Sequence, residues 1–239
     1  MIADVNYILV GPCGAGKSTI MEYFRDRGFM PISTSNLIRA EMQNGGPHAA
    51  LIQHCAVTAD NIPDDIVFSI VKSALHARLD RCFVMESFPY NLAQWTYLKE
   101  WLFMLGILSK KVHFIYLDSD LKTSVERLGG RLTCSKCFRV YQLRVLPPKT
   151  KGKCDACHGP LITREQDNPE TIRRRFDRFE SLTKPILLDA ARSGYQMVTI
   201  DAKRFWSAEP FFQELSRQGV GLRQEVRSRR SSSIEPSGE

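Results

Sequence analysis

The feature that most constrains the fold is a glycine-rich run directly after a short apolar stretch near the start of the chain. The letters YILV at positions 7–10 lead into GPCGAGKST at positions 11–19. A strand that passes through G-x4-G-K-[ST] into a helix forms a phosphate-binding loop, because backbone N–H groups surround an anion at the positive end of the helix. In such a loop Lys17 neutralises the outer phosphates and Ser18 ligates magnesium. We therefore expect a nucleoside triphosphate site; the alternative is a glycine-rich turn without a ligand.

Short apolar runs alternate with longer mixed segments along most of the chain. The apolar runs predict strands that are buried on both faces, at Tyr7–Val10, Cys82–Met85, Val112–Leu117 and Met197–Ile200. The other segments predict helices, at Lys17–Arg27, Ser35–Gln43, Asp64–Arg81, Leu92–Leu105, Leu121–Leu128, Pro169–Ser193 and Phe211–Arg217. Strands separated by helices form a parallel sheet covered on both faces. We therefore predict an α/β protein of this kind, with its ligand at the carboxyl ends of the strands.

Four of the seven cysteines form two closely spaced pairs. Cys134 and Cys137 are followed, after sixteen residues, by Cys154 and Cys157. This C-x2-C…C-x2-C spacing is typical of a structural zinc site with four thiolate ligands. The alternatives are two disulfides, which a reducing compartment disfavours, or a chance arrangement. The sequence therefore predicts a segment in the second half of the chain that is stabilised by a structural zinc ion.

The net charge of +7 is compatible with anionic ligands, and arginine concentrates at residues 164–178 and 217–230. The first cluster could line a polyphosphate site, because a guanidinium group grips phosphate oxygens in pairs. The second cluster lies near the C-terminus in a segment with almost no apolar residues, so we predict a disordered tail over residues 219–239. The apolar run at 101–108 is far shorter than the roughly 20 residues of a membrane helix, and residues 1–4 lack a basic targeting region. These observations predict a cytoplasmic protein with no membrane partner.

Several motifs occur in a fixed order, at 11–19, 33–39, 62–65, 86–90, 127–131, the cysteine pairs and 164–171. From about residue 5 to about residue 205, this ordered set resembles the adenylate kinases, in the long form with a zinc-bearing lid. The resemblance implies a core with the phosphate-binding loop (1–33), an acceptor-binding helical segment (34–63), core (64–130), a zinc lid (131–167), core (168–218) and the tail (219–239). It also implies a monomer that uses ATP, Mg²⁺ and a structural Zn²⁺ to phosphorylate a nucleoside monophosphate, by default AMP.

The resemblance also assigns roles to individual residues. Those implied to bind ATP are Gly14, Ala15, Gly16, Lys17, Ser18, Thr19, Arg127, Arg131, Val140, Tyr141 and Arg204. Those implied to bind the acceptor are Thr34, Arg39, Asp60, Ile62, Ser87, Tyr90, Gln94, Arg164 and Arg175. The implied catalytic set is Lys17, Arg131, Arg164 and Arg175, with Ser18 and Glu86 near magnesium and Cys134, Cys137, Cys154 and Cys157 on zinc.

The acceptor side departs from the family pattern. Where the family has Asp-Gly-Phe-Pro-Arg, this chain has ESFPY at 86–90, so Tyr90 replaces an arginine that grips the acceptor phosphate. Where the family has Ser-Thr-Gly-Asp, positions 33–36 read STSN. A tyrosine offers one neutral hydrogen bond in place of a bidentate charged pair, a loss of roughly 1 to 3 kcal/mol. The resemblance is therefore close on the ATP side and weaker on the acceptor side.

These departures leave more than one function open. The first hypothesis is an active kinase for AMP or for a different nucleoside monophosphate. The second is a non-catalytic or weakly active nucleotide sensor that acts on a partner. Nucleic-acid binding through the cysteine pairs is not expected, because few aromatic residues lie among the basic ones and the lid already accounts for the cysteines.

Overall fold

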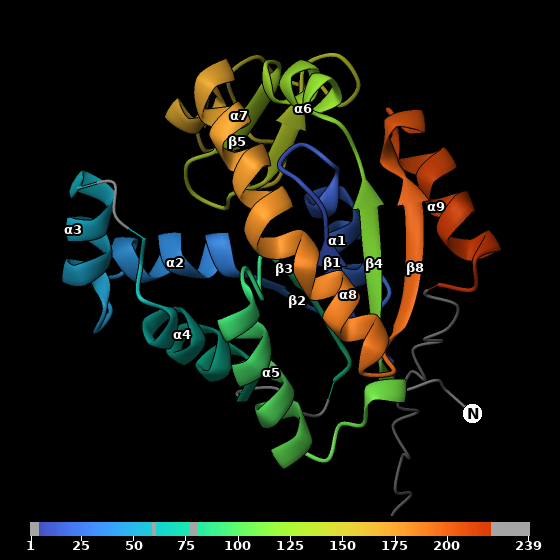
Figure 1. The fold of residues 1–239 in the computed structure, drawn as a ribbon. Coiled ribbons are helices and arrows are strands. Elements are labelled where there is room, and N and C mark those ends of the chain that lie inside the picture. The colour runs from blue at the N-terminus through green and yellow to red at the C-terminus, as the bar shows by residue number, and fades with distance from the viewer. Residues whose placement is uncertain (1–4, 59–60, 77–80, 221–239) are drawn as a thin grey trace, which may run out of the picture.

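A parallel β-sheet forms the centre of the protein, in a computed structural model that describes residues 5–58, 61–76 and 81–220 (Figure 1). Its strands lie in the order β2-β3-β1-β4-β8, and each neighbouring pair is parallel. Their bounds are β1 (Asn6–Val10), β2 (Met30–Ser33), β3 (Phe83–Glu86), β4 (Val112–Asp118) and β8 (Gln196–Asp201). Helices connect consecutive strands, which confirms the predicted α/β fold.

The helices begin where the sequence supplies side chains that cap them. Asn91, Asp120 and Asn168 each accept a hydrogen bond from the backbone N–H three residues further on, and Pro169 occupies a first-turn position. The helices are α1 (Lys17–Arg25), α2 (Thr34–Gln43), α3 (Ala49–Thr58), α4 (Asp64–His76), α5 (Leu92–Met104), α6 (Leu121–Leu128), α7 (Pro169–Arg178), α8 (Lys184–Arg192) and α9 (Ala208–Arg217).

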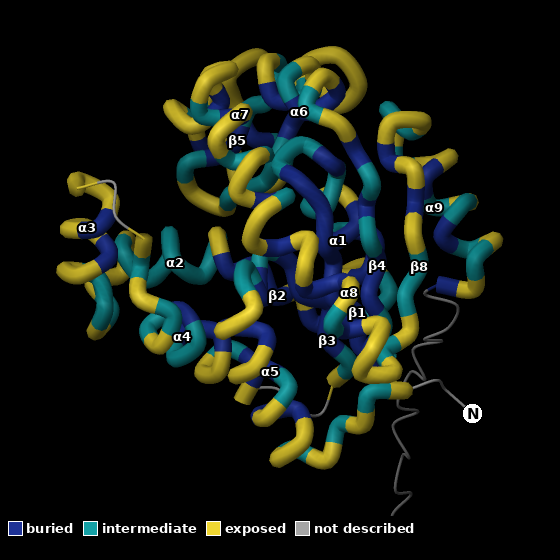
Figure 2. Tube along the Cα trace, viewed as in Figure 1, coloured by how far each residue is buried: buried dark blue, intermediate teal, exposed yellow. Residues whose placement is uncertain are grey.

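The sheet is buried on both faces by two separate hydrophobic clusters (Figure 2). On one face Ile8 and Phe114 pack in a cluster with residues of α4, α5 and α8. On the other face Leu9 and Ile115 pack in a cluster with residues of α1 and α9. Because successive side chains of a strand point to opposite faces, β1, β3, β4 and β8 each contribute to both clusters, whereas β2 contributes only to the first. This explains why the strands read as continuous apolar runs.

Several elements differ from the sequence-based prediction. The prediction missed β2, which contains Pro31; as a proline-containing strand should, it lies at an edge of the sheet. It also missed α3, whose apolar residues do not follow one helical face. The helix predicted over 169–193 is divided: a π-helical turn at Phe179–Thr183 separates α7 from α8. The helix predicted over 64–81 is described as far as His76; residues 77–80 lie outside the described part, and Arg81 does not lie in a helix.

The predicted lid contains a small second sheet that the sequence analysis did not foresee. Its antiparallel strands are β5 (Arg131–Cys134), β6 (Val140–Gln142) and β7 (Leu161–Ile162), in the order β6-β5-β7. Its buried cluster consists of Cys134, Tyr141 and Cys154. Two of these three residues, Cys134 and Cys154, are predicted zinc ligands. An interior this small provides little hydrophobic stabilisation.

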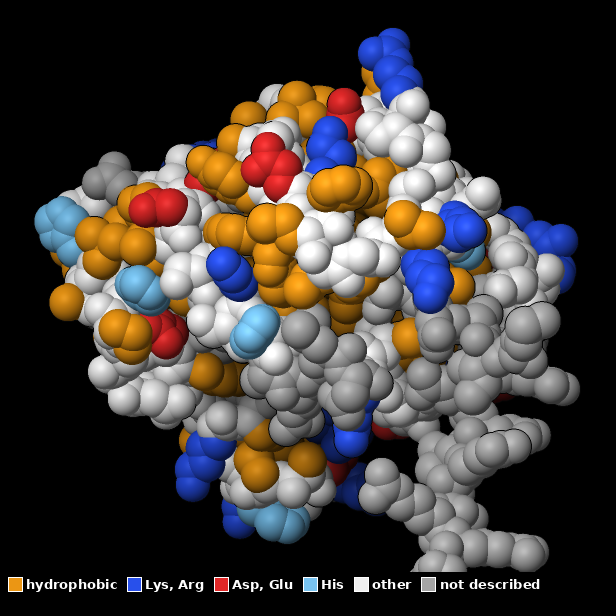
Figure 3. Space-filling model, turned by 90° about the horizontal axis from the view of Figure 1, so that it is seen from below, with side chains coloured by type: hydrophobic (Ala, Val, Ile, Leu, Met, Phe, Trp, Pro, Cys, Tyr) orange, Lys and Arg blue, Asp and Glu red, His pale blue; other side chains and the backbone are white. Residues whose placement is uncertain are grey.

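The periphery carries the most exposed apolar side chains. Residues Phe103, Met104 and Leu108, at and beyond the end of α5, are mostly exposed, and hydrophobic side chains cover much of the face seen from below (Figure 3). The lid lies at the opposite end of the molecule from α5 (Figure 1). Among the residues that the structure describes, none of the helices combines the length and apolar character that a membrane span requires. The predicted tail, apart from residues 219 and 220, lies outside the described residues.

Candidate active site

A cleft of about 1090 Å³ lies between the core, α2 and the lid. Its walls include residues 13–19 of the glycine-rich loop, Arg39 on α2, Glu86 at the end of β3 and residues 137–142 of the lid. The loop directly follows β1, and the neighbouring strand β3 ends beside the loop. The cleft therefore opens at the carboxyl ends of the strands, where the sequence predicted a ligand.

The glycine-rich loop turns tightly into α1. Gly14 and Gly16 have φ values of +80° and +100°, which side-chain-bearing residues rarely adopt. A Cβ on Gly14 would also lie 3.0 Å from the Cα of Ser124. The Nζ of Lys17 donates to the carbonyl oxygens of Gly11, at 2.6 Å, and of Pro12, at 2.7 Å. The loop therefore keeps the lysine ammonium folded against its own backbone.

Burial dominates the electrostatics of Lys17. It lowers the pKa of Lys17 from 10.5 to about 8, although the nearby Glu86 carboxylate opposes the shift. Glu86 is itself buried, and its Oε1 accepts a hydrogen bond of 2.8 Å from the hydroxyl of Ser33, its partner in the β2–β3 register. Ser87, which follows, has a φ of +63° and also lines the cleft. A serine therefore occupies a left-handed position that glycine would take without strain.

The structure brings the predicted arginines Arg39, Arg131, Arg164 and Arg175 to the wall of the same cleft. Burial and the charges of Arg131 and Arg39 lower the pKa of Arg164 to about 10. The Nε of Arg39 and the Nη1 of Arg175 are buried without a hydrogen-bond partner among the described residues. The Nε of Arg39 is therefore suited to an anion bound in the cleft, whereas the Nη1 of Arg175 lies within ion-pair distance of the Asp167 carboxylate.

Asp167, for which no role was predicted from the sequence, organises two of these arginines. The Nε of Arg131 donates to its Oδ2 at 2.8 Å and the Nη2 of Arg131 to its Oδ1, while the Nη1 of Arg175 lies 3.7 Å from Oδ1. The Asp167 side chain is fully buried. Its position three residues after Arg164, just before a capped helix, was the signal available in the sequence.

Other predicted acceptor residues do not line the cleft. The Oε1 of Gln94 accepts from the backbone N–H of Tyr90 at 2.7 Å, and its Nε2 donates to Asp64 at 2.6 Å. Thr34 is buried, and its hydroxyl has no partner among the described residues. The cleft walls therefore include Arg39 and Ser87, but not Thr34, Tyr90, Gln94 or Ile62. Asp60 lies outside the described residues.

Arg127 also lines the cleft, and backbone carbonyl groups hold its guanidinium group. Its Nη2 donates to the carbonyl oxygens of Ala202 and Phe205, both at 2.6 Å, and its Nη1 donates to Gly14 at 3.2 Å. Its guanidinium carbon also lies 5.1 Å from the ring centre of Trp206, a cleft residue that the sequence analysis missed. Val140 and Tyr141 lie in the lid wall, whereas Arg204 is exposed and outside the cleft wall.

The four paired cysteines converge in the lid. Their Sγ atoms lie within 4.8 Å of one another. Burial alone would raise the pKa of Cys154, but hydrogen bonds from the Tyr141 hydroxyl and from backbone N–H groups outweigh it and lower the value to about 6. Four sulfur atoms at these separations fit a tetrahedral site with zinc–sulfur bonds of about 2.3 Å. The residues present therefore suit the predicted zinc ion.

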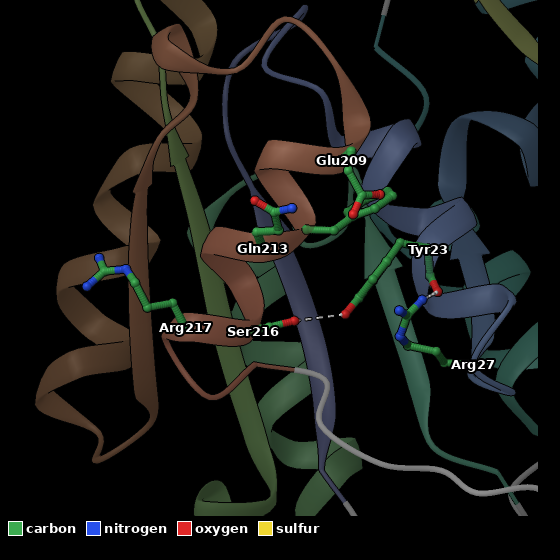
Figure 4. Close-up of a pocket in the computed structure, with 7 residues that line it drawn as sticks. Tyr23, Arg27, Glu209, Gln213, Ser216 and Arg217 are labelled. Carbon is green, nitrogen blue, oxygen red and sulfur yellow. Dashed lines mark hydrogen bonds between the residues drawn. The ribbon is translucent and has the colours of Figure 1, made fainter.

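A smaller depression of about 490 Å³ lies between α1 and α9 (Figure 4). Its walls include Tyr23, whose ring stacks on Phe212 at 4.2 Å and lies 3.4 Å from the Arg27 guanidinium carbon. The hydroxyl of Tyr23 lies 3.5 Å from that of Ser216. None of the predicted site residues that the structure describes lines this depression, so the large cleft remains the candidate active site.

The sheet, the loop after β1 and the cationic cleft define the class of P-loop α/β proteins. Comparison with known proteins then gives the family: the sequence model for adenylate kinase matches residues 9–192. The chain belongs to the adenylate kinase family, as the resemblance implied, and is an enzyme, a nucleoside monophosphate kinase.

The similar proteins cover most of this chain. The adenylate kinase of Syntrophomonas wolfei is 37% identical over 186 residues, which cover 77% of this chain and 85% of the relative. That of Pyrococcus abyssi is 35% identical over 184 residues, covering 77% and 82%. That of Thermosipho melanesiensis is 32% identical over 200 residues, covering 82% and 92%.

Proposed function

We propose that this enzyme transfers the γ-phosphoryl group of ATP to AMP, in the reaction ATP + AMP = 2 ADP. The observation that carries the proposal is the gathering of Lys17 and four arginines in one cleft, between the glycine-rich loop and α2. Two anionic nucleotides repel one another, so a transferase for them needs cations on both sides of the transferred group. The buried Nε of Arg39, which has no hydrogen-bond partner among the described residues, supports this assignment.

Each part of the cleft then has a distinct task. The loop N–H groups and Lys17 hold the donor phosphates, Arg127 lies at the donor base, and Arg39 holds the acceptor phosphate. Arg131, Arg164 and Arg175 lie between the two sites and stabilise the charge that develops during transfer. Ser18 and Glu86 would hold Mg²⁺, which neutralises phosphate charge when bound. The acceptor phosphate is already a nucleophile, so the chain needs no general base.

A second candidate is a kinase for another nucleoside monophosphate. One observation favours it: both polar atoms of the Gln94 amide are occupied by Tyr90 and Asp64. Each amide atom can form a second hydrogen bond, but Gln94 does not line the cleft, so its amide would have to move before it reads an acceptor base. The replacement of the family arginine by Tyr90 weakens the contact to the phosphate of any nucleoside monophosphate, so it does not distinguish AMP from another acceptor.

A coupled assay with ATP, Mg²⁺ and each of AMP, CMP, UMP and GMP tests the proposal. We expect the highest kcat/KM with AMP, and loss of transfer in Lys17→Ala, whose missing charge stabilises the transition state more than the ground state. A higher kcat/KM with another monophosphate would support the second candidate. ATP binding without transfer to any monophosphate would instead indicate a sensor.

A further inference from the structure

The lid touches the acceptor segment directly, through one turn of the zinc site. The guanidinium carbon of Arg39 lies 5.0 Å from the ring centre of Phe138. One helical turn along α2, the Nε2 of Gln43 donates to the carbonyl oxygen of Ser135 at 3.3 Å. Residues four apart on a helix share a face, so one face of α2 meets the turn that contains the first cysteine pair.

Phe138 occupies a backbone position that is costly for a large side chain. It follows the second cysteine of the first pair and has a φ of +63°. His158 follows the second cysteine of the other pair and has a nearly equal φ of +56°. Glycine adopts this conformation without strain. Strain that persists next to a binding cleft is a reason to look for a role of the side chain.

The environment of Arg39 indicates what that role is. Its Nη2 donates to Asn36, whereas its buried Nε has no partner among the described residues. Arg39 and Phe138 both line the cleft. An aromatic ring over a guanidinium plane restricts its rotamers while leaving the N–H donors at its edge available. The ring therefore covers a face of Arg39 and leaves its free donor for a ligand.

We propose that Phe138 is a positioning residue for Arg39 and that, through it, lid closure over ATP prepares the acceptor site. The inference rests on the proposed function, in which Arg39 holds the acceptor phosphate. The ring belongs to the lid and the guanidinium to α2, so the two meet only when the lid lies against α2. Donor binding that favours this arrangement raises acceptor affinity, and by linkage the acceptor raises donor affinity equally.

Two glycine substitutions at equivalent positions test the proposal. Phe138→Gly and His158→Gly both relieve a left-handed residue after a zinc-ligand pair, but only the first removes a ring from Arg39. AMP dissociation constants would be measured by calorimetry for each variant and the wild type, with and without a non-hydrolysable ATP analogue. Zinc content and melting temperature would be recorded in parallel. Phe138→Tyr keeps an aromatic ring and serves as the conservative variant.

We expect Phe138→Gly to weaken AMP binding about threefold to tenfold when the ATP analogue is present, the range of a partly desolvated cation–π contact. Without the analogue its AMP affinity should match the wild type, a pattern that general loss of structure would not give. His158→Gly and Phe138→Tyr should behave as the wild type in both conditions.

Equal AMP affinities for Phe138→Gly and His158→Gly in the presence of the analogue would overturn the inference and leave the proposed function intact. An equal loss with and without the analogue would overturn it as well, because the ring would then act independently of the lid. If the wild type neither binds nor phosphorylates AMP, the proposed function fails first and the inference falls with it.

Discussion

Asp167 is the buried carboxylate on which the arginine cluster depends, and Asp167→Asn tests this directly. The substitution keeps the size of the side chain but removes its charge. Arg131, whose side chain is only 13% exposed, then loses its ionic partner, and Arg175 loses a carboxylate 3.7 Å away. Removing one partner of a buried ion pair costs about 3 to 5 kcal/mol. Because asparagine keeps one acceptor oxygen, we expect a loss of about 3 kcal/mol in the free energy of unfolding.

Urea unfolding without nucleotide measures this loss, with Asp177→Asn, an exposed carboxylate on α7, as the matched control. In the variant, a bound polyphosphate supplies the missing negative charge, so ADP should stabilise Asp167→Asn more than it stabilises the wild type. A loss below about 1 kcal/mol would refute the argument that the pair is energetically important. An equal gain from ADP in variant and wild type would refute the argument that Asp167 and the nucleotide phosphates compete for the same arginines.

Three further predictions concern the lid, the loop and the acceptor site. Cys134→Ser or Cys154→Ser should release zinc and lower the melting temperature while ATP binding persists, since the lid interior is small; protein purified without chelator that contains no zinc would contradict this. Burial lowers the pKa of Lys17 to about 8 in the folded protein, below its ordinary value of 10.5. The buried positive charge therefore lowers the free energy of unfolding below pH 8, and this destabilisation is lost as the pH rises toward 10.5. The stability of the wild type relative to Lys17→Met, measured by urea unfolding without nucleotide, should therefore rise by about 3 kcal/mol between pH 7 and pH 10.5; a difference independent of pH would contradict it. Tyr90→Arg should raise kcat/KM for AMP by roughly tenfold to a hundredfold and leave the KM for ATP unchanged; an equal gain on both substrates would indicate a pocket rebuilt for another purpose.

The parts of the site that could be predicted from the sequence are those encoded by contiguous residues. The glycine-rich loop with Lys17 and the paired cysteines each form a local motif whose spacing carries the chemistry. The contact of Arg39 with Phe138 joins residues about 100 positions apart, and that of Arg127 with Trp206 joins two chain segments that only the fold brings together. Such contacts leave no periodic signal in one sequence.

The fold was predictable to a similar degree and for a similar reason. Buried parallel strands are continuous apolar runs, so four of the five central strands were found. The fifth, β2, is short and contains Pro31, and the lid strands are too short to show alternation. The hydrogen bonds of the Gln94 amide could not be predicted either, since nothing in the sequence indicates that the amide bonds to Asp64 and to the backbone of Tyr90.

The π-helical turn at Phe179–Thr183 sets the rotational phase between α7 and α8. An α-helix advances 100° per residue, and a π turn holds about one more residue than an α turn, so α8 is rotated by about 100° relative to an uninterrupted helix. This offset lets Arg175 point toward the cleft while Ile186, in the same long helical segment, packs into the core. Deleting one residue within the turn would force either the arginine out of the cleft or the isoleucine out of the core. One added residue thus allows a single helical segment to serve two surfaces that a regular helix could not face at once.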